Sequence, residues 1–174
     1  VWQWNHNPVE SKWSLSARPG ALRLHTLPAS QFLWARNSLT QRAIGPVSIA
    51  TTTLDAAGLQ PGDTAGLALL NMPFASVGVA RAEAGFVLRF YDQMSNESIE
   101  TSLSSSRVFL RASGDYDNDV ARFSYSTDGK QFAPLGGPFT AQPGRWIGAK
   151  VGLFCTAASA ARGGHADCDW FRVE

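Results

Sequence analysis

Acidic side chains are the first residues here whose type and spacing could support catalysis. Asp167 and Asp169 alternate near the end of the chain, so on a β-strand both carboxylates would lie on one face. Hydrolysis of a glycosidic bond needs two carboxyl groups that face one cleft. The sequence has no ExDxxE run that would supply such a set from one strand. We therefore expect these two aspartates to cap a sheet edge or to bind a structural cation, and we predict no catalytic residue in this chain.

The histidines and cysteines give no recognisable nucleophilic or redox site. None of His6, His25 and His165 lies near a GxSxG motif, which would present a serine on a sharp turn. Cys155 and Cys168 lack the CxxC spacing of zinc and redox sites. They fall on two consecutive predicted strands, so a disulfide bond and a pair of buried thiols are both open interpretations, and the redox compartment is not fixed.

Alternating aspartates in the stretch DYDNDV, residues 115–120, are similar to a calcium-binding loop. An EF-hand loop requires glycine at its sixth position and a bidentate glutamate at its twelfth. Those positions hold Val120 and Ser126 here. The residues that follow are typical of a strand, so we predict a polar hairpin turn. We assign no metal site and predict no cofactor; a structural calcium ion stays open, although no motif supports it.

Aromatic residues beside planar polar ones are the pattern that points to a binding function. In WQWNHNP, residues 2–8, Trp2 and Trp4 share one strand face and Asn5 follows. The apolar face of a sugar ring stacks on such indoles, while amide groups bind its hydroxyls. Trp4 and Asn5 are therefore candidate carbohydrate-binding residues. A first strand that closes the sheet is the alternative, and it is the interpretation that we favour.

The stretch FLWARNSLTQR, residues 32–42, has the same character and is predicted to form one long strand. Trp34 and Arg36 would lie on one side of this strand and Gln41 on the other. These three residues are candidate carbohydrate-binding residues because polar groups near an aromatic ring suit a sugar site. A ladder of cross-strand hydrogen bonds is the alternative.

Trp146 is the most unusual aromatic residue of the chain. In PGRWIGAKVGLFC, residues 143–155, alternation predicts a strand over Trp146–Cys155 whose core face carries Val151, Leu153 and Cys155. Trp146 falls on the other face, beside Gly148 and Gly152, which would leave an open floor for a flat partner such as a sugar ring or another domain. We therefore predict that Trp146 contacts carbohydrate.

Composition restricts the class of protein. The 174 residues suit one domain, residues 1–174, with a sizeable core, and 44% hydrophobic against 17% charged residues argues for a folded chain. A net charge of +1 does not favour nucleic acid as a partner, and no apolar run reaches the length of a membrane span. The chain begins with Val1 and has no signal-peptide pattern. We expect a processed protein or an excised module, with an extracellular or periplasmic location favoured and the bacterial cytoplasm left open.

Short alternating apolar runs, separated by glycine and proline turns, predict an all-β fold. Too many strands are expected for one small sheet, so we predict a sandwich of two antiparallel sheets. The non-core faces of several strands would carry arginines, hydroxyl groups and aromatic rings. The predicted strands are Ala21–His25, Phe32–Arg42, Val47–Leu54, Thr64–Leu70, Ser76–Arg81, Gly85–Tyr91, Ser98–Leu103, Arg107–Ala112, Val120–Ser126, Trp146–Cys155 and Ala166–Val173.

Six blocks in order give the sequence a resemblance to a known family. They are WQWNHNP…WSL…RPGALRL, ARNSLTQRAIGP, GDTAGLAL, FSYSTDGKQFAPLG, GAKVGLFC and ADCDWFRVE. Together they resemble the C-terminal β-sandwich of glycoside hydrolase family 43 β-xylosidases and α-L-arabinofuranosidases. The resemblance covers nearly the whole chain and implies a concanavalin-like jelly roll, a fold that includes xylan-binding carbohydrate-binding modules.

The resemblance also implies partners and roles. In that family the catalytic carboxylates lie in a separate β-propeller, and an aromatic residue of the sandwich reaches the rim of the active-site pocket. Trp146 stands at that position, whereas Cys168 stands where an aromatic residue is commoner, which leaves a Cys155–Cys168 bridge open as a local feature. We therefore expect a non-catalytic module that binds xylan or arabinoxylan chains. The alternative is a structural domain that docks on the catalytic β-propeller without binding xylo-oligosaccharide itself.

Overall fold

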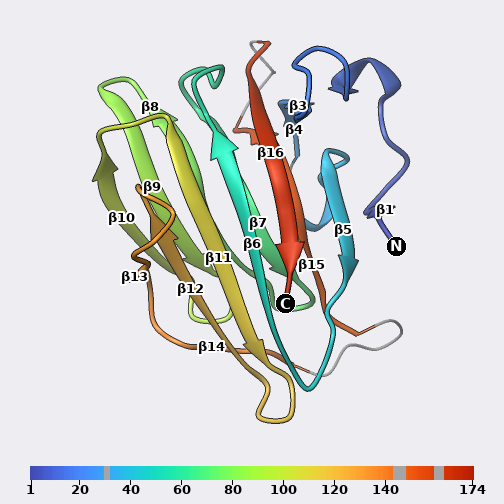
Figure 1. Ribbon diagram of the computed structural model, residues 1–174, viewed down its shortest axis with the longest axis vertical. Helices are drawn as coiled ribbons and strands as arrows, with labels where there is room; N and C mark the ends of the chain where they lie inside the picture. Colours follow the sequence, from blue (N-terminus) through green and yellow to red (C-terminus); the bar gives the residue numbers. More distant parts are fainter. Residues whose placement is uncertain (30–31, 143–147, 159–162) are drawn as a thin grey trace.

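The computed structural model describes residues 1–29, 32–142, 148–158 and 163–174. Two β-sheets stack face to face, with the strands of one sheet in front of those of the other in Figure 1. This arrangement confirms the predicted all-β sandwich. Every strand pair is antiparallel except β4 with β15. In the described part of the chain the helices are single 3-10 turns, and no helix has the length and apolar character to cross a membrane.

Each sheet is built from strands that are distant in sequence. Sheet A has the order β1 (Gln3–Trp4), β5 (Ser38–Arg42), β15 (Lys150–Ala157), β7 (Asp63–Leu70), β8 (Ala75–Ala82), β9 (Gly85–Asp92) and β10 (Glu97–Leu103), with β4 (Leu27–Pro28) beside β15. Sheet B has the order β13 (Ala133–Pro134), β12 (Val120–Ser126), β11 (Arg107–Asp115), β6 (Val47–Asp55), β16 (His165–Val173), β3 (Leu22–His25) and β2 (Trp13–Ser14), with β14 (Phe139–Thr140) beside β12.

Alternation along the strands places one face of each in a common core. Leu88 and Phe90 of β9, Leu110 of β11 and Phe123 of β12 are at most 1% exposed. The Phe90 and Phe123 rings meet across the two sheets at 5.7 Å between centroids. Burial of such side chains stabilises the fold by about 1.5–3 kcal/mol each. The core therefore lies between the inner faces of sheets A and B.

The segment 32–42 is not one strand, and that prediction was wrong. The structure has a 3-10 turn, η2 (Phe32–Trp34), and β5 begins only at Ser38. Asn37 separates the two elements because its buried side-chain amide donates to the carbonyl oxygens of Lys12 and His25. An amide that binds two distant carbonyl groups fixes the chain locally and competes with a continuous sheet ladder. Trp34 and Arg36 therefore lie outside any strand.

The predicted strand Trp146–Cys155 is shorter at its start. β15 begins at Lys150, after Gly148, which has a left-handed φ of 68°. Trp146 and the rest of residues 143–147 lie outside the described residues. The predicted open floor is also wrong at Gly152, because this residue is buried and a Cβ there would collide with the carbonyl oxygen of Leu39.

Phe154 shows that the outer face of sheet A is covered near β15. The strand pattern placed Phe154 on a non-core face, yet it is only 4% exposed. The Phe32 ring of η2 packs edge-on against it at 4.8 Å and stacks on Phe74 at 4.6 Å. The 3-10 turn that replaces the predicted strand thus brings an aromatic cover over the sheet, and a period-two pattern alone could not reveal it.

Three local predictions concern turns and thiols. The stretch 115–120 is the tight turn between β11 and β12, where Asn118 donates to Asp115, so the predicted polar hairpin is confirmed. Among the described residues no group of three histidine, cysteine or acidic side chains could hold a metal ion. Cys155 and Cys168 are both free and buried, on strands of opposite sheets. Of the two interpretations left open by the sequence, the structure therefore agrees with the pair of buried thiols.

Candidate functional site

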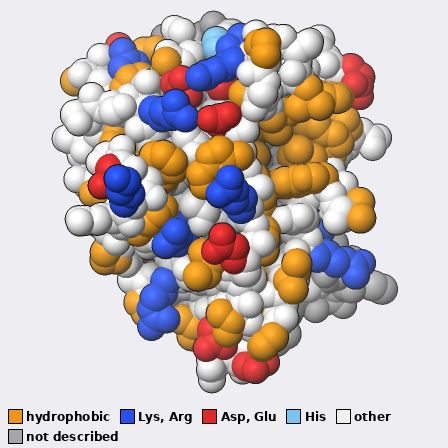
Figure 2. All heavy atoms as spheres, in the orientation of Figure 1, with side chains coloured by type: hydrophobic (Ala, Val, Ile, Leu, Met, Phe, Trp, Pro, Cys, Tyr) orange, Lys and Arg blue, Asp and Glu red, His pale blue; other side chains and the backbone are white. Residues whose placement is uncertain are grey.

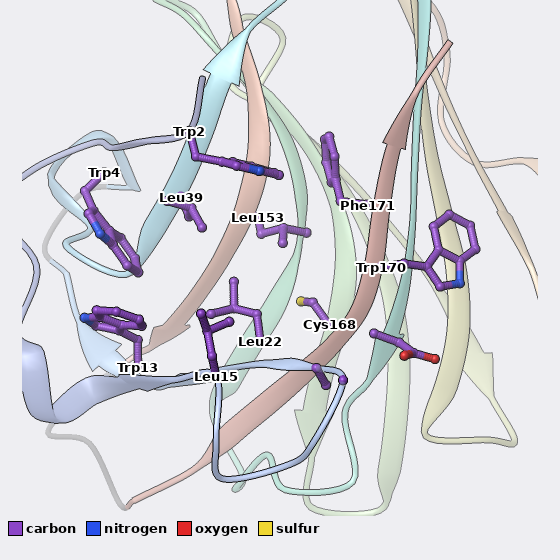
Figure 3. Close-up of a pocket in the computed structure, with 13 residues that line it drawn as sticks. Trp2, Trp4, Trp13, Leu15, Leu22, Leu39, Leu153, Cys168, Trp170 and Phe171 are labelled. Atoms are coloured by element: carbon purple, nitrogen blue, oxygen red, sulfur yellow. The ribbon is translucent and has the colours of Figure 1, made fainter.

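An apolar hollow opens between the two sheets beside the N-terminal segment (Figure 3). Its volume is about 480 Å³, within the range of ligand and docking pockets. Strands of both sheets contribute, because β1 is the edge strand of sheet A and β2 is the edge strand of sheet B. The lining includes Trp2, Trp4, Trp13, Leu15, Leu22, Leu39, Leu153 and Phe171.

Indole rings form much of the wall of the hollow. Trp4 of β1 packs against Trp13 of β2 at 5.6 Å between ring centroids, which joins the two sheet edges. Trp2 packs edge-on against Phe171 at 4.8 Å. Trp2 is nevertheless 41% exposed and Leu15 is 65% exposed, and Figure 2 shows a broad hydrophobic area on this side of the molecule. Large exposed apolar patches of this kind mark interaction surfaces.

Two of the predicted carbohydrate-binding residues form side-chain hydrogen bonds to other parts of the chain. The Asn5 side-chain amide donates to the Leu33 carbonyl oxygen at 2.6 Å, and the His6 ring lies 2.9 Å from the same oxygen. The Arg36 Nε donates to the Asn7 carbonyl oxygen at 2.8 Å. Asn5 and Arg36 therefore tie the segment around η2 to the N-terminal segment, which explains their position in the sequence without a sugar.

The remaining predicted residues do not gather at one place. Trp4 lines the apolar hollow and Trp34 stands 60% exposed at the end of η2. Gln41 on β5 lines a different hollow of about 390 Å³ with Val1 and other residues of that edge. Trp146 lies outside the described residues. Trp4 also forms part of the strand that closes sheet A, which agrees with the favoured structural interpretation.

Sequence reasoning missed most of the hollow. Trp13 lies in β2 and Leu15 directly follows that strand, and a strand of two residues gives no periodic signal. Phe171 follows a β-bulge between Cys168 and Phe171 that shifts the alternation of β16. The one available signal was the presence of three tryptophans within the first thirteen residues.

Asp167 does not lie at a sheet edge, because β16 is an inner strand of sheet B. Its carboxylate is bound by arginines instead. Arg23 donates to both of its carboxylate oxygens at 2.8 Å, and Arg18 bridges it to Asp55. Burial raises the pKa of Asp167, but hydrogen bonds from Arg23 and Arg18 outweigh burial, so the pKa falls below its ordinary value. Asp169 forms a separate ion pair with Arg107 at 3.0 Å. The arrangement favours ion pairs over cation binding.

Two histidines lie beside the ion pairs of Asp167, and they predict that the folded state is less stable in mild acid. His25 and His165 are cross-strand neighbours with ring centroids 5.7 Å apart. Burial lowers the pKa of both rings, and the charge of His165 lowers that of His25 further. The unfolded chain therefore takes up protons first as pH falls through the ordinary value of 6.5, and protons then favour unfolding.

We expect the melting temperature to fall between about pH 7 and about pH 5 and to fall again below about pH 4, where Asp55 and Asp167 lose their charge. Thermal unfolding across this range measures the effect. His25→Gln should reduce the first decrease and keep the second. A melting temperature that stays constant from about pH 8 to about pH 5 would contradict this assignment.

Comparison with known proteins identifies the domain. The sequence profile described as the β-xylosidase C-terminal concanavalin A-like domain, of glycoside hydrolase family 43, matches residues 1–174. A putative β-xylosidase of Xylanibacter ruminicola is 34% identical over 161 residues, which are 92% of this chain and 30% of that protein. A β-xylosidase of Formosa agariphila is 32% identical over 196 residues, covering 99% of this chain and 33% of that protein.

A solved structure agrees with these sequence comparisons. The bifunctional GH43-CE protein of Bacteroides eggerthii matches with a TM-score of 0.94 and 35% identity, over 100% of this chain and 23% of that chain. The chain thus spans about a third or less of the relatives that it matches. It belongs to the family of C-terminal concanavalin A-like domains of family 43 β-xylosidases.

Proposed function

We propose that this chain is a non-catalytic accessory domain that docks on the catalytic β-propeller of a xylan-degrading enzyme. The apolar hollow is the observation that carries this proposal, because its exposed Trp2 and Leu15 offer apolar area to a large partner. Trp2, which lines the hollow, directly follows Val1 in the sequence, and the curated relatives are about three times as long as this chain. A catalytic domain that precedes residue 1 would therefore lie next to the hollow.

The carboxylates support the non-catalytic part of the proposal. A glycosidase acid must hold a proton near neutral pH, which requires a raised pKa. Asp167 has a lowered pKa and is bound by two arginines, and Asp169 is paired with Arg107. Asp167 therefore lacks the raised pKa of a proton donor, and the carboxylate of Asp169 already has a partner in Arg107.

A charge placed in the hollow is expected to prevent docking. Leu15→Asp should weaken association with the separately produced catalytic domain at least about tenfold, because a carboxylate would be buried at the interface. Leu15 is exposed, so the isolated domain should fold as before. Size-exclusion chromatography and recovery of aryl-xyloside hydrolysis measure the effect.

Met94→Asp is the matched control, because Met94 is 59% exposed and lies in the turn between β9 and β10, outside the residues that line the hollow. It should leave association unchanged. Equal loss in both variants, or full association of Leu15→Asp, would rule out docking through the hollow.

A second candidate function is direct binding of xylan or arabinoxylan. The exposed Trp34 indole favours it, since flat exposed rings stack on sugars. Calorimetric titration of the isolated chain with xylo-oligosaccharides should then show binding whose affinity falls up to about tenfold in Trp34→Ala, because stacking on an aromatic ring contributes about 0.5–1.5 kcal/mol. Trp146→Ala tests the remaining predicted residue in the same assay. Undisturbed binding by both variants would exclude these rings.

A further inference from the structure

The outer face of sheet B carries an ordered set of arginines and aromatic rings. We call Arg111, Arg172, Phe109, Phe132 and Trp170 the arginine–aromatic face. Strand register places Arg172, Thr51 and Arg111 in one row across β16, β6 and β11. Figure 3 shows Trp170 on the side of β16 that points away from Leu22 and Leu153. Trp170 is also one of the residues that line the apolar hollow, so the face adjoins the hollow and shares this residue with it.

Each arginine of this face has its guanidinium over an aromatic ring. The Arg111 guanidinium carbon is 3.6 Å from the Phe132 ring centroid, and that of Arg172 is 4.7 Å from the Trp170 ring. Phe109 lies next to Trp170 at 6.2 Å between centroids, so the two stacked pairs flank an aromatic centre. Stacking holds a guanidinium in one plane and leaves its N–H edge available for an oxygen acid.

Charge on this face is positive where the rings lie. Among the described residues, Arg111 and Arg172 form no ion pair, and Arg111 uses only its Nε, which donates to the Thr51 hydroxyl. Asp169 is already paired with Arg107, while Glu174 follows Arg172 at the end of β16. Figure 2 shows this face with basic side chains spread between hydrophobic ones.

We propose that the arginine–aromatic face binds the acidic sugar units of a xylan chain, in which carboxylates are attached to the sugar rings. A carboxylate accepts two parallel N–H bonds from a guanidinium, which explains why both arginines keep free edges. Half-buried Phe109, Phe132 and Trp170 offer ring surface to the apolar side of a sugar. The choice of xylan rests on the proposed function; the requirement for carboxylate follows from the arginines.

The two arginines also suit an extended ligand. They are two strands apart on the same row, which corresponds to about 10 Å between their backbones. Thr51 lies between them on β6 with its hydroxyl bonded to Arg111. A polymer that lies across the strands would meet one guanidinium, the hydroxyl and then the second guanidinium. A flat, charged surface of this kind fits a chain better than a single small molecule.

Calorimetric titration of the isolated chain with glucuronoxylan tests the proposal. The matched ligand is the same polymer after chemical reduction of its carboxyl groups to alcohols. We expect reduction of the polymer to weaken binding about tenfold or more, and Arg111→Gln with Arg172→Gln to have the same effect on the acidic polymer. Added salt should weaken wild-type binding as well.

Arg81→Gln is the matched control, because Arg81 also stacks on a ring, Phe86 at 4.6 Å, but belongs to sheet A. It should bind the acidic polymer like the wild type. Leu15→Asp should also bind it like the wild type, so failure of docking at the hollow and failure of this proposal give different results.

Four outcomes of the xylan titrations would overturn the proposal. These are no binding of glucuronoxylan, equal binding of the reduced polymer, equal loss in Arg81→Gln, and undiminished binding by the double arginine variant. Poly-glutamate carries carboxylates without sugar rings and serves as the last probe. Binding of poly-glutamate as tight as that of glucuronoxylan would make the face a general polyanion site and would likewise overturn it.

Discussion

Replacing Gly78 with alanine is expected to lower the free energy of unfolding by about 4 kcal/mol, a large part of the stability of a typical domain. Gly78 of β8 lies directly opposite Gly66 of β7 in the register of sheet A. A Cβ at position 78 would lie 2.5 Å from the carbonyl oxygen of Ala65 and 3.2 Å from the Cα of Gly66. Both neighbours are backbone atoms of a paired strand, so neither can move without breaking the ladder. Denaturant unfolding measures the loss.

Gly137→Ala is the control for this experiment. Gly137 lies in the stretch between β13 and β14, and no atom lies within 4 Å of a Cβ built there. Its substitution should change the unfolding free energy by less than about 0.5 kcal/mol. If Gly78→Ala were as stable as Gly137→Ala, the close approach of β7 and β8 would not be required for the fold.

Asp167→Asn is expected to destabilise the domain by about 2 kcal/mol. The substitution keeps the shape of the side chain but removes its charge and replaces one acceptor oxygen by a donor. Arg23 and Arg18 would then face an amide nitrogen in a place where Asp167 is only 6% exposed. The side chains of Arg23 and Arg18 are 22% and 39% exposed, so water takes up part of the loss, but each arginine loses a charged acceptor at this half-buried site. Urea unfolding near neutral pH gives the difference.

Asp169→Asn provides the comparison two residues along the same strand. Its ion pair with Arg107 has both side chains about half exposed, so water and salt screen it. The expected loss is about 0.5 kcal/mol or less. Equal losses for the two asparagine variants would show that burial does not distinguish the two ion pairs.

Much of the fold could be predicted from alternation alone. Strands such as Val120–Ser126 have the predicted bounds, and the predicted core-face residues Val151, Leu153 and Cys155 of β15 are buried. This works because each of these strands has one face in a single core, so a period of two records burial directly. The antiparallel sandwich followed from the number of such strands.

The candidate site was less predictable because it depends on contacts between distant segments. The interruption of residues 32–42 comes from the Asn37 amide, whose acceptors are Lys12 and His25. The hollow forms where β1 and β2, the edges of opposite sheets, bring Trp4 against Trp13. Neither contact leaves a periodic trace in the sequence. Resemblance to a family supplied the domain class, but it could not supply these pairings.

The reactivity of the two buried cysteines reports how often the two sheets separate. Burial raises the pKa of Cys155 well above its ordinary value and that of Cys168 to about 12, and neither thiol is more than 4% exposed. Alkylating reagents attack thiolates that they can reach, so labelling must wait until the sheets separate around these side chains. One thiol belongs to each sheet, so the rate of thiol alkylation would measure the rate at which the two sheets separate. No other probe would have to be added to the protein.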